Sequence, residues 1–243
     1  MATYARASSA VPFIPAGEVE RVRGPAEHIA WFGAGLAAAF LTPYVLTGPL
    51  DLQNDIYYLM YFTVALSFLY AYVRWSGVDL RALFSRGWRW SLALGLVVAV
   101  FVVINVLSRD STPHPSGPYF VFQLFWRGGV YGAVDALLLT AFPGLVAFGV
   151  LRGQLAGILR RAAYVVLAAA LVMIVTGVYH LGYQQFREDG IAGPETGNII
   201  ISVPMLATLN PVGSVLAHAS MHVAAEAHAH ETDVFLPPQV ETD

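Results

Sequence analysis

The chain has 243 residues, of which 57% are hydrophobic and only 12% are charged, and its formal net charge is -3. This composition is that of an integral membrane protein and offers no basic surface for nucleic acid. The absence of cysteine excludes disulfides and cysteine-ligated zinc or redox centres.

Six apolar regions follow a polar N-terminal segment. Four of them approach the roughly 20 residues that cross a bilayer, and they are 28–50, 56–73, 90–108 and 162–186. Two regions are longer: 119–151 is interrupted by Pro143, and 196–225 is interrupted by Asn210-Pro211. The second interruption should separate a short segment, 199–209, from a final helix, 211–227. We therefore predict an all-α, polytopic membrane helical bundle with six to seven transmembrane helices, eight at most.

The transmembrane helical domain should span residues 28–227, between a polar N-terminal tail, 1–27, and a polar C-terminal tail, 228–243. The end of the C-terminal tail has two adjacent prolines and too few apolar residues to cross a membrane, so we expect it to lie extended on the membrane surface. The stretch RDSTPHPSGP, residues 109–118, should form an irregular loop because it has three prolines and no periodicity.

Arginines are concentrated in alternate loops. Residues 74–89 contain four and residues 152–161 contain three, whereas 49–55 has none, and 109–117 and 187–195 have one each. Because short cytoplasmic loops keep an excess of positive charge, the arginine-rich loops and the N-terminus should be cytoplasmic. We expect a multi-pass protein of the cell inner (cytoplasmic) membrane, surrounded by membrane lipids.

Asp135 is the clearest polar residue inside a predicted span, where an ionisable side chain is costly. It borders a stripe of small residues, Gly128, Gly132 and Ala136, that lets another helix approach closely. Asp135 should therefore face protein, either as a helix-contact residue bonded to a neighbour or as part of a functional site.

Histidines gather near the C-terminus. His218 and His222 are four positions apart and share one helix face, which Glu226 extends by a turn. Two imidazoles and a carboxylate can hold a divalent metal such as zinc, provided that His180 or Asp135 is brought alongside. The candidate metal ligands are His180, His218, His222 and Glu226. His180 alone, near the outer end of its span, would be a structural residue.

His228 and His230 differ from these residues in their surroundings. They lie in EAHAHETD, where polarity rises and the helix should emerge from the membrane. We expect both side chains to be solvated.

The stretch NPVGSVLAHASMHVAA resembles the last motif of the intramembrane CAAX prenyl endopeptidase and bacteriocin-processing family, also called the Abi or type II CAAX protease family. In that motif a histidine is followed four residues later by asparagine. His218 matches the histidine, and His222 stands at the asparagine position. His180, in VTGVYHLGY, resembles the family's second histidine motif.

The family's first motif is a Glu-Glu pair followed by an arginine, and GAVDALLLTAFPGLVAFGVLRG is similar to it in position only. Val134-Asp135 replaces the pair, and Leu139 stands at the arginine. The resemblance covers roughly residues 118–227. It implies a protease-like half in which Asp135, His180, His218 and His222 would be the catalytic residues that activate water for attack on a peptide carbonyl. Without the Glu-Glu pair, the chain would be a diverged bacterial member, inactive or dependent on the shorter Asp135.

Two other classes of function stay open. A non-catalytic subunit would dock a membrane-protein partner or complex through its small-residue stripes and polar tails. A cofactor protein would ligate a haem or a chlorophyll through His180 and either His218 or His222, on different helices. A visible absorption spectrum distinguishes the cofactor protein from the other classes.

Overall fold

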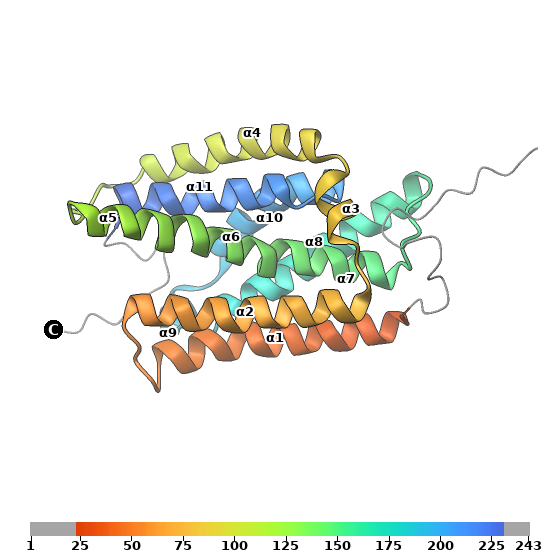
Figure 1. Cartoon of the computed structure of the whole chain (residues 1–243), viewed down its shortest axis with the longest axis horizontal. Helices are drawn as coiled ribbons and strands as arrows, with labels where there is room; N and C mark the ends of the chain where they lie inside the picture. Colours follow the sequence, from red (N-terminus) through yellow and green to blue (C-terminus); the bar gives the residue numbers. More distant parts are fainter. Residues whose placement is uncertain (1–22, 231–243) are drawn as a thin grey trace, which may run out of the picture.

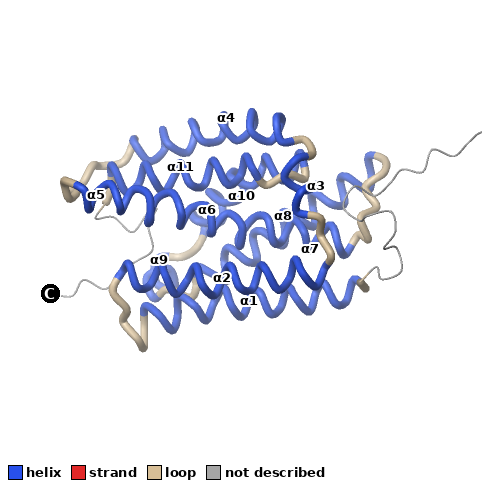
Figure 2. The backbone as a smooth tube through the Cα atoms, in the orientation of Figure 1, coloured by secondary structure: helices blue, strands red, loops and turns tan. Residues whose placement is uncertain are grey.

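A computed structural model describes residues 23–230 of the chain, and throughout this range the backbone forms helices and loops with no strand (Figures 1 and 2). The predicted all-α class is confirmed. Most of the predicted N-terminal tail and nearly all of the C-terminal tail lie outside the described residues. Residues 25–27 belong to the first helix instead of the tail.

The helices follow the predicted apolar regions closely. The first half of the described chain contains α1 (Pro25–Thr47), α2 (Asn54–Ser76), the short α3 (Leu80–Ser85) and α4 (Trp88–Leu107). The second half contains a continuous helical segment, Pro118–Val150, then α8 (Ile158–His180), the short α9 (Gln184–Asp189), α10 (Ala192–Thr208) and α11 (Val212–His228).

Five helical segments of the described chain are long and apolar enough to cross a membrane: α1, α2, α4, Pro118–Val150 and α8. These helices indicate a membrane-embedded protein. The helices α10 and α11, of 17 residues each, lie beside them. Residues 109–117, between α4 and the next helix, are irregular as predicted.

The segment Pro118–Val150 remains helical through Pro143, so the predicted interruption at this proline is wrong. The segment consists of α5 (Pro118–Gln123), the π-helix η2 (Leu124–Val130), α6 (Tyr131–Ala136), the π-helix η3 (Leu137–Ala141) and α7 (Phe142–Val150). The Phe142 amide donates to the Leu137 carbonyl, five residues back. This wider turn, immediately before Pro143, accommodates a residue that has no N–H to donate and whose ring would crowd a regular α-helical turn.

The predicted break at Asn210-Pro211 is confirmed, because α10 ends at Thr208 and α11 begins at Val212. The Asn210 side chain fixes this turn against α3. Its Nδ2 lies within hydrogen-bond distance of the carbonyl oxygens of Leu83, Phe84 and Arg86, at 2.8, 3.0 and 2.9 Å. The two helices are therefore separate segments joined by an anchored corner.

The helix α11 lies against α4 and against η2 and α6 (Figure 1). Glycines make these approaches possible: a Cβ on Gly128 would meet the Val223 backbone at 2.8 Å, and one on Gly132 would meet the Ala219 backbone at 2.7 Å. The predicted small-residue stripe thus packs against another helix of the same chain, α11.

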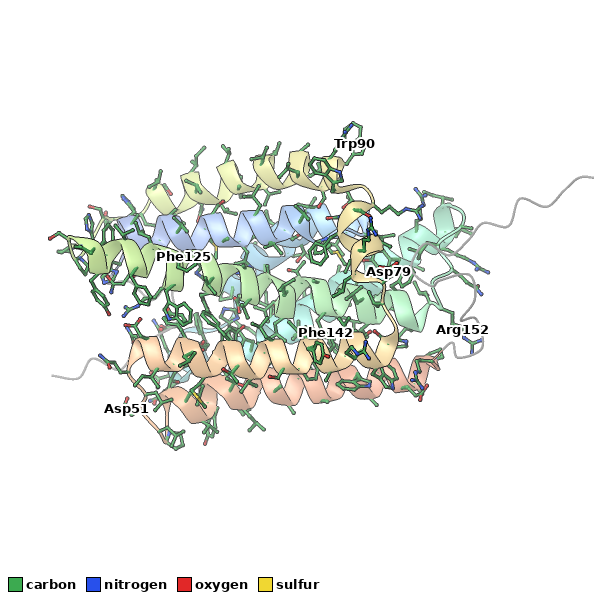
Figure 3. The ribbon with its side chains drawn as sticks, in the orientation of Figure 1. Asp51, Asp79, Trp90, Phe125, Phe142 and Arg152 are labelled. Carbon is green, nitrogen blue, oxygen red and sulfur yellow. The ribbon has the colours of Figure 1, made fainter. Side chains whose placement is uncertain are left out.

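The bundle has two distinct ends, which we name after short helices. At the α9 end lie α5, α9 and the loop that contains Asp51; at the α3 end lie α3 and the loop that contains Arg152 (Figures 1 and 3). The helices α4 and α11 run parallel, since Ser91 contacts Gly213 near their starts and Arg109 contacts His228 near their ends. Both therefore finish at the α9 end.

Candidate metal and hydrolytic site

Asp135, His218 and His222 converge inside the bundle. Each offers one potential ligand atom, a carboxylate oxygen or an imidazole nitrogen, and these atoms all lie within 4.8 Å of one another. The three residues are only 3 to 4% exposed. In an apolar helix bundle such a concentration of ionisable groups is energetically costly, and this cost marks the cluster as a candidate functional site.

The close packing of α6 on α11 creates this convergence. Gly132 lies one turn before Asp135, and the residue it contacts, Ala219, follows His218. Because the two backbones approach so closely, Asp135 Oδ2 lies 3.4 Å from His218 Nε2. His222, one turn further along α11, stacks on His218 with a ring-centroid distance of 5.0 Å and an interplanar angle of 13°.

A second helix orients the carboxylate. The Tyr61 hydroxyl, on α2, donates a hydrogen bond of 2.6 Å to Asp135 Oδ1. The two carboxylate oxygens therefore have separate partners, Tyr61 on one and His218 on the other. The Tyr131 ring packs edge-on against His222, with centroids 4.7 Å apart, and restricts the orientation of that imidazole.

His218 has one nitrogen without a hydrogen-bond partner. Its Nδ1 is buried, and no group of the described residues lies in position to bond it. Its other nitrogen, facing Asp135 at 3.4 Å, is further away than the 2.7–2.9 Å typical of a charge-assisted hydrogen bond. A buried imidazole with one unsatisfied nitrogen and one long contact is under-bonded for a purely structural residue.

The site borders a cavity of about 730 Å³ whose lining includes Asp135, His180, His218 and His222. His180 Nδ1 lies 2.8 Å from the Thr176 carbonyl oxygen. Since a carbonyl only accepts, Nδ1 carries the proton and Nε2 keeps the lone pair. His180 therefore shares the cavity with the cluster, although it does not belong to the group of three ligand atoms.

Glu226, predicted as a metal ligand, lies in another part of α11. Its carboxylate is 1% exposed and pairs with His230, Oε1 to Nδ1, at 3.1 Å. In the described structure it does not belong to the group formed by Asp135, His218 and His222. The predicted solvation of His230 is wrong, because its side chain is 17% exposed and paired with Glu226. His228 is half-buried, with Nε2 2.9 Å from the Arg109 carbonyl oxygen.

Tyrosines around the cavity were not predicted from the sequence. Three of them, Tyr131, Tyr179 and Tyr183, line the cavity and form a chain of hydroxyl hydrogen bonds, 2.8 Å between the first two and 2.7 Å between the last two. Tyr57 extends the chain through its bond to Tyr183. Two sequence signals could have indicated part of this chain of tyrosines: the cluster of tyrosines at positions 57, 58 and 61, and the spacing of four between Tyr179 and Tyr183 on either side of His180.

The fold and the site together define a class: a helical, membrane-embedded protein with a buried aspartate-histidine cluster beside a cavity. No family model, no curated protein and no solved structure matches this chain. The resemblance to the CAAX-type peptidases therefore stays a prediction that rests on the motifs alone.

Proposed function

We propose that the protein is a membrane-embedded hydrolase, a diverged relative of the CAAX-type intramembrane peptidases, in which Asp135, His218 and His222 hold a divalent cation such as zinc. One observation carries the proposal: three buried ligand atoms from two helices lie within 4.8 Å of one another beside a cavity. Two imidazoles and a carboxylate form a common ligand set of catalytic zinc sites, in which the fourth position is left for water.

The spacing of Asp135 and His218 is compatible with two ligands of one metal ion. Two ligands that each lie 2.0–2.1 Å from a tetrahedral ion are about 3.3 Å apart. The observed distance between Asp135 Oδ2 and His218 Nε2 is 3.4 Å. Tyr61 would serve as the outer partner that orients the carboxylate, the role that outer hydrogen bonds have in metal sites.

When bound, the cation would supply a nucleophilic water at neutral pH and polarise a carbonyl oxygen. His180 supplies the proton transfer: its Nε2, unprotonated while Nδ1 donates to Thr176, accepts a proton from the attacking water and returns it to the leaving group. Tyr61 holds Asp135 in place throughout. The water oxygen would bond to the carbonyl carbon, the bond between that carbon and the leaving group would break, and the proton held by His180 would pass to the leaving group, so that one water is consumed.

The same proposal includes the membrane arrangement. We place α10 and α11 with the five longer segments as spans, since 17 residues lie at the short end of the range that crosses a bilayer. Seven spans put the two ends of the chain on opposite sides. With the arginine-rich loops inside, the N-terminus is cytoplasmic and the membrane is the cell inner membrane.

Metal content of the purified protein tests the site. We expect about one equivalent of zinc in the wild type and the loss of most of it in His218→Ala and Asp135→Ala, because each removes one of the three ligands. His228→Ala is the matched control, a histidine on the same helix outside the group, and should keep its zinc. Equal and negligible metal in all four proteins would refute the metal site.

Hydrolysis is tested separately, with an internally quenched peptide and p-nitrophenyl decanoate in detergent micelles. Turnover should be present in the wild type and in His228→Ala, and should fall at least 100-fold in Asp135→Asn and His180→Ala. Turnover that is absent, or equal in every variant, argues against a hydrolase. A strong visible absorption band in the purified protein would instead favour the cofactor protein with His180 and His218 as axial ligands.

A further inference from the structure

The cavity lies at one end of the bundle. Apart from the residues of α6, η3 and α11 at the buried cluster, its lining comes from the last turns of α4, from the end of α8 and the loop after it, from α9 and from the first turns of α10, all of which are at the α9 end (Figure 1). His222 and His218 are six and ten residues before the end of α11, so at 1.5 Å per residue the site is about 9 to 15 Å below that end. This depth is within one leaflet, whose hydrocarbon layer is about 15 Å thick.

Several residues that line the cavity are exposed and mark its rim, among them residues of α4 and α10. On α4 the exposed residues Phe101 and Asn105 line it, and on α10 the exposed residues Ala192 and Thr196 do. Gly193 lies in the same rim, and a Cβ built there would have no atom within 4 Å. The rim is therefore open, and it lies in the first turn or two below the helix ends.

Charge differs strongly between the two ends of the bundle. In the described chain the α3 end carries eight arginines: Arg23, Arg74, Arg81, Arg86, Arg89, Arg152, Arg160 and Arg161. At the α9 end, two arginines are exposed, Arg109 and Arg187, and a third, Arg127, is paired with Asp55 at 2.9 Å. Besides Asp55 and the buried Glu226, the same end carries five carboxylates, Asp51, Asp110, Glu188, Asp189 and Glu195, whereas the α3 end of the described chain carries two, Glu27 and Asp79.

We infer that the cavity opens on the extracytoplasmic side of the membrane and takes a neutral or cationic ligand from that side. The inference rests on the seven-span arrangement proposed above and on the position of the cavity, whatever reaction the site performs. The positive-inside rule places the α3 end in the cytoplasm and the rim on the opposite face. The excess of carboxylates there attracts cations and repels anions.

The absence of cysteine from the chain makes the sidedness directly measurable. Ala192→Cys places a unique thiol at the rim, and Ser85→Cys places the matched thiol on the exposed surface of α3 at the other end. A membrane-impermeant sulfonated maleimide should label Ala192→Cys in intact cells and Ser85→Cys only in inverted vesicles. Thr196→Cys, also exposed at the rim, repeats the test if the first variant fails to accumulate.

Labelling of the rim thiols only in inverted vesicles would overturn the inference, and so would rim thiols that react only after detergent is added. The charge preference is measured on the same variants with a trimethylammonium methanethiosulfonate and its sulfonate counterpart. Corrected for their rates with a free thiol, the cationic reagent should react severalfold faster at Ala192→Cys, and the difference should shrink at high salt. An equal or reversed preference at low salt would overturn the assignment of the ligand's charge. None of these results depends on hydrolysis. Failure of the hydrolase assay can therefore be distinguished from failure of this inference.

Discussion

Tyr61 is the side chain on which the orientation of Asp135 depends. It is 1% exposed, and its hydroxyl makes the hydrogen bond to Oδ1 that leaves Oδ2 directed at His218. We expect Tyr61→Phe to weaken zinc binding about tenfold while Asp135 and both histidines remain, because outer partners of a ligand typically contribute that much. Competition with a fluorescent zinc chelator measures the affinity.

Tyr70→Phe is the control for this change, since Tyr70 is on the same helix and is 69% exposed. It should leave zinc affinity unchanged. If Tyr61→Phe also binds zinc as tightly as the wild type, the hydrogen bond to Asp135 stabilises the fold and has no part in metal binding.

Helix periodicity predicted which residues of the site face inward. His218 and His222 share a face and are both buried, as expected, and Asp135 beside the small-residue stripe faces protein. Tyr61 could not be predicted, because its contact with Asp135 joins residues 74 positions apart and depends on how α2 packs against α6. Glu226 shares the histidine face by spacing, but it pairs with His230, the next residue of the same i, i+4 series, instead of with His218 and His222.

At the scale of single elements, the contact between α4 and α11 has no room for a side chain. A Cβ on Gly213 would overlap the Ser91 carbonyl oxygen, and that oxygen belongs to the backbone and cannot rotate away. We expect Gly213→Ala to destabilise the protein by about 3 kcal/mol through overpacking. The apparent melting temperature, followed by loss of the monodisperse gel-filtration peak, should fall by roughly 6–12 °C.

Gly193→Ala is the matched change on α10, where the added methyl group meets nothing within 4 Å. Alanine has the higher helix propensity, so this variant should melt at the wild-type temperature or slightly above it. Similar losses in both variants would mean that the α4-α11 contact is less tight than the structure has it.

Two predicted breakers behave differently for a reason that lies outside their own residues. At Asn210-Pro211 the asparagine amide finds three backbone carbonyls at the end of α3, so leaving the helix adds hydrogen bonds. At Pro143 the surrounding segment is buried, and unpaired backbone groups there would be costly. The chain keeps its helix at this point by widening one turn instead of breaking. Sequence alone shows both breakers but not these neighbours.

For the whole molecule, the apolar lengths predicted most spans within a few residues, because a bilayer sets the length that a helix needs. The order in which the helices pack was not predictable, since nearly every apolar face could fit several others. The cavity follows from that packing order. Its walls come from segments as far apart as Phe101 and His222, and no local pattern connects them.

The segment Pro118–Val150, which carries Asp135, has a further consequence for the response to bilayer thickness. Its 33 residues extend about 50 Å, far more than a hydrocarbon core of about 30 Å, yet 78% of its most apolar stretch is covered by protein, against 33% for α1, α2 and α4. Lipids therefore contact mainly the outer helices, and these helices tilt when their apolar length does not match the thickness of the bilayer. In nanodiscs of 14-carbon and 20-carbon lipids the melting temperature of the protein should differ while its zinc affinity stays constant. A zinc affinity that changes with the length of the lipid chains would show that bilayer thickness acts on the site itself.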